Sequence, residues 1–309
     1  MPQITFDKRF EPRNTLSGHI VIFMWNPFAK PFHEDTNETP YVKPADFAAD
    51  AASRPAAFIT GGASGIGKAT AQRLLNLGWT VGVYDVQEVA WGTSEIPEGQ
   101  LITGHLDVTD RDGWDSALAE FTSQTGGRLD FLFNNAGIII DGLLVDQDPE
   151  KIRALVDINC LGVTFGAQAA HPYLKATKGA VLINMSSASA IFGQPEISTY
   201  SATKFYVNGI TEALSVEWRN DDIRVHDLMP LWAATQVANV KAQSVKTMGV
   251  NLTPGDVADE AVRVLTKNAP WGKWVPHYAV SLTDRLLKWL RKPFPDPIAQ
   301  LLMRFVATW

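Results

Sequence analysis

Short apolar runs alternate with helical patterns along this chain from residue 56 to about residue 276. The runs are continuous rather than alternating, which indicates strands that are covered on both faces. A regular alternation of such strands with helices predicts an α/β chain with one doubly wound parallel sheet and right-handed crossovers. The predicted strands are Ala56–Thr60, Thr80–Tyr84, Leu101–Leu106, Leu129–Phe133, Ala180–Ile183, Ile223–Leu228 and Lys273–Pro276.

The chain divides into three parts by composition. Residues 1–54 are rich in proline and charge and have no sustained period, so we expect an N-terminal extension there. Residues 55–280 form the predicted sheet domain. Residues 281–309 carry leucines at helical spacing and several basic residues, which predicts a C-terminal amphipathic helical tail. Within the sheet domain the predicted helices lie near residues 65–77, 111–125, 149–175, 199–219 and 255–267.

A glycine-rich turn, from Thr60 to Gly67, follows the first predicted strand and opens the first predicted helix. Glycines allow the tight turn and let the backbone approach a pyrophosphate, and the helix directs free N–H groups and its positive dipole end at the phosphates. This context is the one that a dinucleotide site requires. The residues expected to contact the dinucleotide are Gly61, Ser64, Gly65, Ile66 and Gly67.

Acidic residues end the second and third predicted strands. Asp85 is placed to accept hydrogen bonds from ribose hydroxyls and to repel a 2′-phosphate, so we expect NAD rather than NADP. In the alternative, NADP binds and Lys68 or Arg73 meets its phosphate. Asp107 and Val108 are expected beside the adenine, although Asp107 is equally suited to cap the next helix.

Small and amide residues follow the fourth strand. Asn135, Ala136 and Gly137 let a cofactor lie against the backbone, while the asparagines tie neighbouring loops; the same letters also fit a plain turn. Asn159 interrupts a helix with an apolar face, and a buried amide needs hydrogen-bond partners.

Tyr200 and Lys204 are four residues apart on a predicted helix, so they lie on one face of it. A cation beside a phenol lowers the pKa of the phenol, which a general acid–base at neutral pH requires. Ser187, just past the fifth strand, is placed to hydrogen-bond the same reacting oxygen. The alternative is an ordinary surface tyrosine and lysine.

Five motifs now stand together: Thr60-Gly-x-x-x-Gly65-x-Gly67, Asn134-Asn-Ala-Gly137, Asn159, Ser187 and Tyr200-x-x-x-Lys204. In order and spacing the chain resembles the short-chain dehydrogenase/reductase family over about residues 55–280. The resemblance implies a Rossmann-type domain that moves a hydride between a nicotinamide cofactor and an alcohol or carbonyl substrate.

The resemblance also implies roles for four residues. Tyr200 donates or removes the proton on the substrate oxygen, and Ser187 orients the carbonyl. Lys204 holds the nicotinamide ribose and lowers the pKa of Tyr200. Asn159 holds a water that continues a proton relay from the lysine.

One segment departs from the family pattern. Leu231 follows Pro230 where the family usually has glycine, so a Cβ stands where positive φ is often adopted and the path of the loop is open. Pro230 and Thr235 are expected at the cofactor, with Thr235 against the nicotinamide carboxamide. Residues 232–254 are expected to form a lid.

Apolar residues surround the expected substrate site. With Ser187, we expect Ala188, Phe192 and Trp232 to line a pocket for an alcohol, ketone or aldehyde carried on a hydrophobic body. The alternative for Phe192 is simple packing within its loop. A protein that binds the dinucleotide without turnover is the alternative from another functional class.

Composition excludes several partners. The net charge of −6 and the pI near 5.5 argue against nucleic acid, and no metal site is expected. Cys160 is the only cysteine, and no apolar run approaches a membrane span, so a cytoplasmic location is expected. The resemblance implies a homodimer or homotetramer, and the tail is suited to packing on the protein, to a second subunit or to peripheral contact with a membrane.

Overall fold

The described part of the structure covers most of the predicted sheet domain. The expected N-terminal extension lies outside it apart from Arg54, as does the tail beyond Arg291 apart from Arg304, so the division into three parts stays a prediction. This computed structural model describes residues 54–91, 96–235, 242–266, 275–291 and 304, all within the compact unit Pro31–Trp309.

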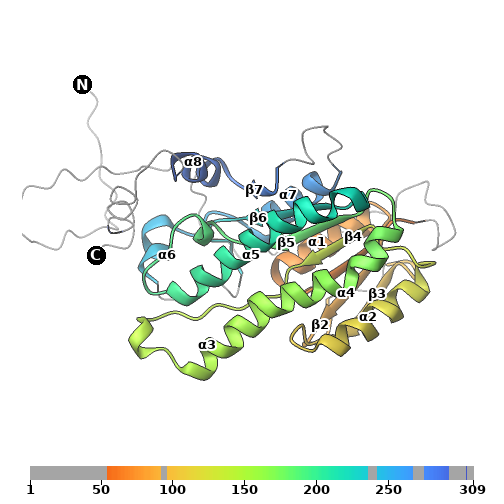
Figure 1. Ribbon diagram of the computed structural model, residues 1–309, viewed down its shortest axis with the longest axis horizontal. Coiled ribbons are helices and arrows are strands. Elements are labelled where there is room, and N and C mark those ends of the chain that lie inside the picture. Colours follow the sequence, from red (N-terminus) through yellow and green to blue (C-terminus); the bar gives the residue numbers. More distant parts are fainter. Residues whose placement is uncertain (1–53, 92–95, 236–241, 267–274, 292–303, 305–309) are drawn as a thin grey trace, which may run out of the picture. The chain divides into compact units, whose positions relative to one another are not determined.

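Seven parallel strands form one sheet in the order β3-β2-β1-β4-β5-β6-β7 (Figure 1). The predicted doubly wound parallel sheet is therefore confirmed. The order reverses between β1 and β4, and sheets of this kind bind ligands at that reversal, beyond the carboxyl ends of the strands. The strands are β1 (Ala56–Thr60), β2 (Thr80–Asp85), β3 (Leu101–His105), β4 (Phe131–Asn134), β5 (Val181–Met185), β6 (Arg224–Met229) and β7 (His277–Ala279).

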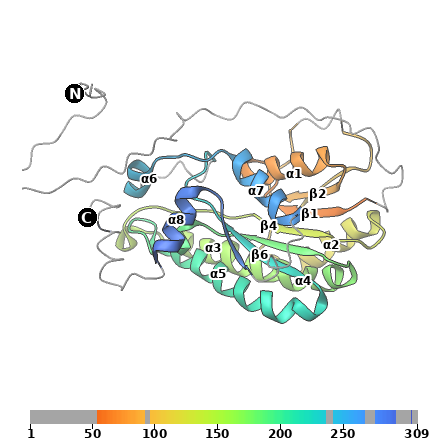
Figure 2. The same cartoon turned by 90° about the horizontal axis from the view of Figure 1, so that it is seen from above.

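Helices cover both faces of the sheet (Figure 2). On one face α1 and α7 bury Leu74 and Val257 in a shared apolar cluster, and on the other face α2 and α4 bury Trp114 and Leu174. Helix α5 packs on this second face, against β6. The α-helices are α1 (Gly65–Asn76), α2 (Arg111–Gln124), α3 (Pro149–Val156), α4 (Val163–Ala176), α5 (Ser198–Glu217), α6 (Gln243–Met248), α7 (Pro254–Thr266) and α8 (Leu282–Arg291), and short 3₁₀ turns lie at Leu144–Asp146, Ala188–Ala190 and Trp218–Asp221.

Strand β1 is buried at every position, as its continuous apolar sequence predicts. Phe58 stacks on Tyr84 of β2 with ring centroids 4.3 Å apart, and it meets Phe121 of α2 edge-on at 5.5 Å. Such pairs stabilise beyond the area that they bury. The strand that carries the glycine turn is thus held rigidly from two sides.

The helix predicted over residues 149–175 is divided by a π-helical turn, Asp157–Gly162. Asp148 caps its start by accepting a hydrogen bond from the Glu150 N–H, and Pro149 occupies the first turn. A π turn widens the helix by one residue, and such turns are frequent at functional sites. Here it contains Asn159.

One further prediction, the bounds of the last strand, differs from the structure, and the lid stays a prediction. The last strand is His277–Ala279, whereas Lys273–Pro276 was expected; residues 273 and 274 lie outside the described residues, and Val275 and Pro276 precede the strand. Within the segment expected to be a lid, α6 (Gln243–Met248) is helical and residues 236–241 lie outside the described part.

Candidate active site

The glycine turn lies at the carboxyl end of β1, beside the end of β4. Gly61 has a φ of +65°, and a Cβ there would lie 2.8 Å from the Cα of Ala136. Gly65 also has positive φ, at +55°, and a side chain at Gly67 would collide with the carbonyl oxygen of Gly61. These positions require glycine, as the sequence predicts.

Helix α1 begins inside this turn and presents an open N-terminus. Its N-cap residue, Ser64, makes no side-chain capping bond, and its first turn contains no acidic residue. The N–H groups of Gly65, Ile66 and Gly67 precede the first intrahelical donor, Lys68, which bonds the Ser64 carbonyl. Free N–H groups and the positive dipole end fit a pyrophosphate here.

Asp85 lies at the end of β2 against the same turn. Its Oδ2 accepts from the Ala63 N–H at 3.0 Å and its Oδ1 from the Gln87 N–H at 2.9 Å. Trp91 donates from Nε1 to the Gly62 carbonyl at 3.1 Å. The carboxylate therefore has a fixed direction at the rim of the turn, where a ribose would lie.

Asp107 and Val108 follow β3. Asp107 accepts hydrogen bonds from the N–H and hydroxyl of Thr109, while Asp110 caps α2, so Asp107 is not the helix cap. Val108 is buried, and a Cβ at Gly162 of the π turn would lie 2.8 Å from its Cγ2. The residues after β3 thus lie at the same edge of the sheet as Asp85, since β3 pairs in parallel with β2.

The residues after β4 tie the two central strands together. Asn135 donates from Nδ2 to the carbonyls of Thr60 and Gly61 at 2.9 and 3.0 Å. The Ala136 N–H donates to the Thr60 hydroxyl at 3.1 Å. A Cβ at Gly137 would lie 3.7 Å from the Nζ of Lys204, so glycine leaves space in front of the ammonium group. The sequence analysis includes Thr60 in the glycine motif but does not predict that its hydroxyl joins the two loops.

Tyr200 and Lys204 both lie on α5 and are both buried. The Lys204 Nζ donates to the Met185 carbonyl at the end of β5 at 2.9 Å and lies 5.5 Å from the centroid of the Tyr200 ring. The surface interpretation of this pair is therefore wrong. Helix α5 holds a phenol and an ammonium group together against the end of the sheet.

Ser187 meets Tyr200 from the loop after β5. It is the N-cap of the 3₁₀ turn Ala188–Ala190, and its Oγ accepts from the Ser189 N–H at 3.1 Å. Burial raises the pKa of the Tyr200 phenol, and the Ser187 side chain acts in the opposite direction. The structure thus brings together the serine, tyrosine and lysine that the sequence selects.

The pKa values differ from the sequence expectation. Burial raises the pKa of Tyr200 to about 12, and this effect exceeds the lowering by Ser187. Burial also lowers the pKa of Lys204 to about 8. Desolvation disfavours the charged form of each group, so the expected lowering of the tyrosine pKa by the lysine is not found in this arrangement.

Asn159 is fully buried in the π turn, and its side-chain amide is bonded on both ends. Its Oδ1 accepts from the Ile138 N–H at 2.9 Å, and its Nδ2 donates to the Ile138 carbonyl at 2.9 Å and to the Thr203 hydroxyl at 3.2 Å. The amide therefore joins the chain after β4 to α5, next to Lys204. Thr203 is a second residue that sequence reasoning missed.

The loop after β6 does not need glycine at residue 231. Among the described residues other than glycine, only Glu196 and Asp222 have positive φ, so Leu231 takes an ordinary backbone conformation. The Pro230 carbonyl accepts from the Ala188 N–H at 2.9 Å. The methyl group of Thr235 would lie 3.3 Å from a Cβ on Gly65, which places Thr235 over the glycine turn.

The expected substrate-pocket residues fall into two apolar clusters. Trp232 packs with Tyr200 and Ile197. Ala188 and Phe192 pack instead with Met229, in a separate cluster beneath the loop that carries Ser187. The structure therefore favours the packing role for Phe192 and leaves Trp232 as the apolar wall beside Tyr200.

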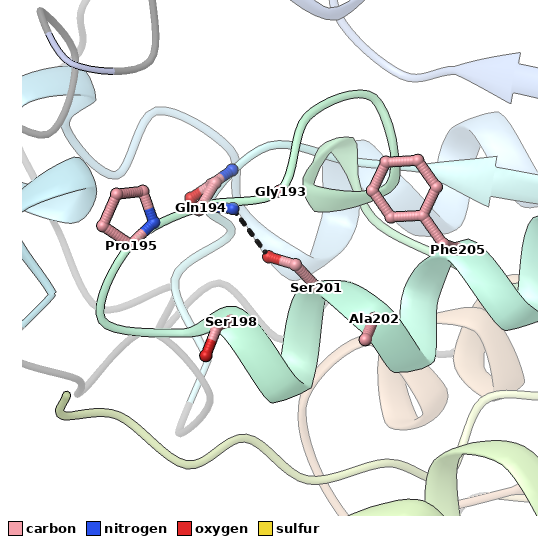
Figure 3. Close-up of a pocket in the computed structure, with 7 residues that line it drawn as sticks. All are labelled: Gly193, Gln194, Pro195, Ser198, Ser201, Ala202 and Phe205. Carbon is pink, nitrogen blue, oxygen red and sulfur yellow. Dashed lines mark hydrogen bonds between the residues drawn. The ribbon is translucent and has the colours of Figure 1, made fainter. Parts of the chain in front are cut away.

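A separate pocket of about 520 Å³ opens on another face of α5 (Figure 3). The Gln194 N–H, in the loop above the helix, donates to the Ser201 hydroxyl at 3.1 Å. Tyr200 and Lys204 do not line it. Sequence reasoning did not predict this hollow, which is lined by Gly193, Gln194, Pro195, Ser198, Ser201, Ala202 and Phe205.

Comparison with known proteins gives consistent matches. The family profile described as short chain dehydrogenase matches residues 55–246. A 3-oxoacyl-[acyl-carrier-protein] reductase of Thermotoga maritima is 33% identical over 202 residues, which is 64% of this chain and 81% of that protein. A 3alpha-hydroxysteroid dehydrogenase of Mediterraneibacter gnavus is 30% identical over 209 residues, 66% of this chain and 84% of that protein.

Two solved structures share the fold. The crystal structure of a 3-ketoacyl-(acyl-carrier-protein) reductase from Brucella melitensis complexed with NADH has a TM-score of 0.65 and 27% identity, covering 73% of this chain and 96% of that chain. Levodione reductase has a TM-score of 0.66 at 22% identity, covering 78% of this chain and 98% of that chain, a likeness of fold.

Proposed function

Because the chain belongs to the short-chain dehydrogenase family, we propose that it interconverts a hydrophobic, secondary alcohol and its ketone, or an alcohol and its aldehyde, with NAD. Family membership makes it an oxidoreductase that acts on CH–OH groups with a nicotinamide dinucleotide. The proposal adds the substrate class, the choice of NAD and the residue roles. The observation that carries it is the burial of Tyr200 and Lys204 together on α5, with the Lys204 Nζ 5.5 Å from the centroid of the Tyr200 ring and bonded to the Met185 carbonyl, two residues before Ser187.

Tyr200 is the proposed general acid–base. A substrate oxygen placed between Tyr200 and Ser187 meets two O–H groups, of which the phenol transfers its proton and the serine stabilises the developing charge. With a pKa raised to about 12 by burial, Tyr200 keeps its proton at neutral pH and is ready to act as the acid in carbonyl reduction. A nicotinamide dinucleotide held at the glycine turn would supply the hydride in that direction and accept it in the other.

Lys204 and Asn159 are proposed to support this transfer. The Nζ of Lys204 faces the space left by Gly137, where it would hold the nicotinamide ribose. In a proton relay Asn159 would act through its backbone, because its side-chain amide already bonds Ile138 and Thr203.

The Tyr200→Phe variant tests these roles. It removes the transferred proton and little else, so kcat should fall by about 10²–10⁴-fold while the Kd for NADH stays within about twofold. The measurement is the change in reduced-nicotinamide absorbance with a panel of hydrophobic alcohols and ketones, together with NADH fluorescence titration. Turnover comparable to the wild type would refute the assignment. A wild-type protein that binds NADH but turns over none of the panel would favour the non-catalytic alternative.

Asp85 supports NAD rather than NADP. Its carboxylate is held against the glycine turn by the Ala63 and Gln87 N–H groups, and a 2′-phosphate there would meet negative charge. In the NADP alternative Lys68 or Arg73 would meet the 2′-phosphate. Of these two, Arg73 forms an ion pair with Asp259, with its Nε 3.0 Å from Oδ1.

We expect the wild type to bind NADH at least about tenfold more tightly than NADPH, because about 1.4 kcal/mol of repulsion is enough for that ratio. Asp85→Asn keeps the shape and removes the charge, so the ratio of the two Kd values should fall towards one. Asp107→Asn is the matched control and should leave the ratio unchanged. Equal affinity of the wild type for NADH and NADPH would contradict the choice of NAD.

We also propose that the chain forms a homodimer or homotetramer. Phe205 and Tyr206 of α5 are 45% and 42% exposed, and Phe205 borders the pocket on that face. Large exposed aromatic side chains beside a hollow are typical of interaction surfaces. Sedimentation velocity gives the assembly directly, and a monomer at micromolar concentration would refute it.

A cytoplasmic location with peripheral membrane contact through α8 completes the proposal. Leu282, at the start of α8, is 74% exposed, and the basic residues Arg285, Lys288 and Arg291 follow it. Within the described part of the chain, no helix has the length and apolar character to cross a membrane.

Co-sedimentation with vesicles that contain anionic lipid tests this contact. Leu282→Glu should lower the bound fraction severalfold, since it replaces an apolar side chain with a charge that anionic lipid repels. Leu77→Glu, at a leucine that is 50% exposed after α1, is the matched control. Equal sedimentation of the wild type and both variants, or none by the wild type, removes the membrane contact.

A further inference from the structure

Helix α8 follows the last strand and lies at the same end of the sheet as α6 (Figures 1 and 2). None of the residues selected for cofactor or proton transfer lies on it. Its contacts nevertheless go to three segments that carry or adjoin those residues. Three features describe these contacts: apolar packing by Leu287, a buried carboxyl at Asp284, and a hydrogen bond from Lys288 to the backbone of β7.

The apolar contact joins α8 to the loop of Ser187. Leu287 packs on the cluster formed by Ala188, Phe192 and Met229. Ser187 directly precedes this cluster and caps the 3₁₀ turn inside it. The position of Ser187 relative to Tyr200 therefore depends on a cluster that α8 helps to cover.

A buried carboxyl fixes the start of α8. Asp284 is fully buried; its Oδ2 accepts from the Ser281 N–H at 2.9 Å, and its own N–H donates to the Ser281 hydroxyl at 3.1 Å. The loop after β6 is connected to α8 by apolar packing, because Leu231 packs on the same cluster as Leu287.

A hydrogen bond to the backbone of β7 links α8 to α5 through His277. Lys288 donates from Nζ to the His277 carbonyl at 2.7 Å. The imidazole of His277 bonds Asp227 of β6 at 2.6 Å and Glu212 of α5 at 2.8 Å. Helix α8 is therefore linked, through His277, to the helix that carries Tyr200.

We propose that α8 is a positioning element of the active site, with Leu287 as the positioning residue that holds the Ser187 loop and Leu231 of the loop after β6 in register with Tyr200. This inference rests on the proposed function, because it concerns the same site. It assigns the C-terminal helix a part in catalysis through two loops that it touches, and not through contact with substrate or cofactor.

The test compares two adjacent leucines. Leu287 packs on the Ser187 loop, whereas Leu286 is 48% exposed on the same helix. In the full-length chain, Leu287→Ala should lower kcat about tenfold or more, because Ser187 loses its support, and should leave the Kd for NADH within about twofold, because the glycine turn is untouched. Leu286→Ala should change neither, and Leu287→Met, which conserves volume, should restore kcat.

Asp284 gives a second, independent variant if Leu287→Ala folds poorly. Asp284→Ala removes the carboxyl and should lower kcat with an unchanged Kd for NADH, while Asp284→Asn retains an oxygen acceptor and should recover most of it. A purely structural role would instead lower the melting temperature with kcat per folded molecule unchanged. That result in both Leu287→Ala and Asp284→Ala would overturn the proposal.

Amide hydrogen exchange separates this inference from the proposed function. Leu287→Ala should speed exchange in residues 188–192 and 230–232, and Leu286→Ala should not. A wild type without turnover would refute the proposed function while exchange still reports the contact. An active wild type with no change in kcat or exchange on Leu287→Ala would refute the role of α8 alone.

Discussion

The bond from the buried ammonium group of Lys204 to the Met185 carbonyl fixes α5 against the end of β5. A buried charge is costly unless it is paired, so the Met185 carbonyl defines where the lysine can lie. Tyr200, one turn earlier on the same helix, is placed by the same bond. Ser187 lies near Tyr200 because the loop that carries it follows the same strand, β5.

Sequence reasoning identifies most of the sheet because parallel strands covered on both faces carry continuous apolar runs, as in β1. It does not place the edge strand β7, three residues long, whose His277 is held by Asp227 and Glu212, far away in the sequence. It also misses the π turn around Asn159, since a shift of backbone bonding within a helix depends on packing and leaves the side-chain period almost unchanged.

Within the site, too, local spacing can be predicted from the sequence and tertiary contacts cannot. Spacing brings Tyr200 and Lys204 together, because side chains four apart share a helix face. The direction of their pKa shifts follows from burial, a tertiary property that spacing does not contain. The separation of Phe192 from Trp232, and the contacts of α8 with both loops, likewise depend on how distant segments pack.

The pH dependence of kcat/KM for alcohol oxidation tests the central claim, that Tyr200 is the general acid–base and that the buried Lys204 supports its proton transfer. Oxidation needs a site that has lost a proton, and burial lowers the pKa of Lys204 to about 8, so Lys204 should lose its proton near that pH. We predict that kcat/KM rises with pH, with a midpoint near 8, and then levels off. If kcat/KM does not change between about pH 6.5 and 9.5, the range in which this proton would be lost, the account is contradicted.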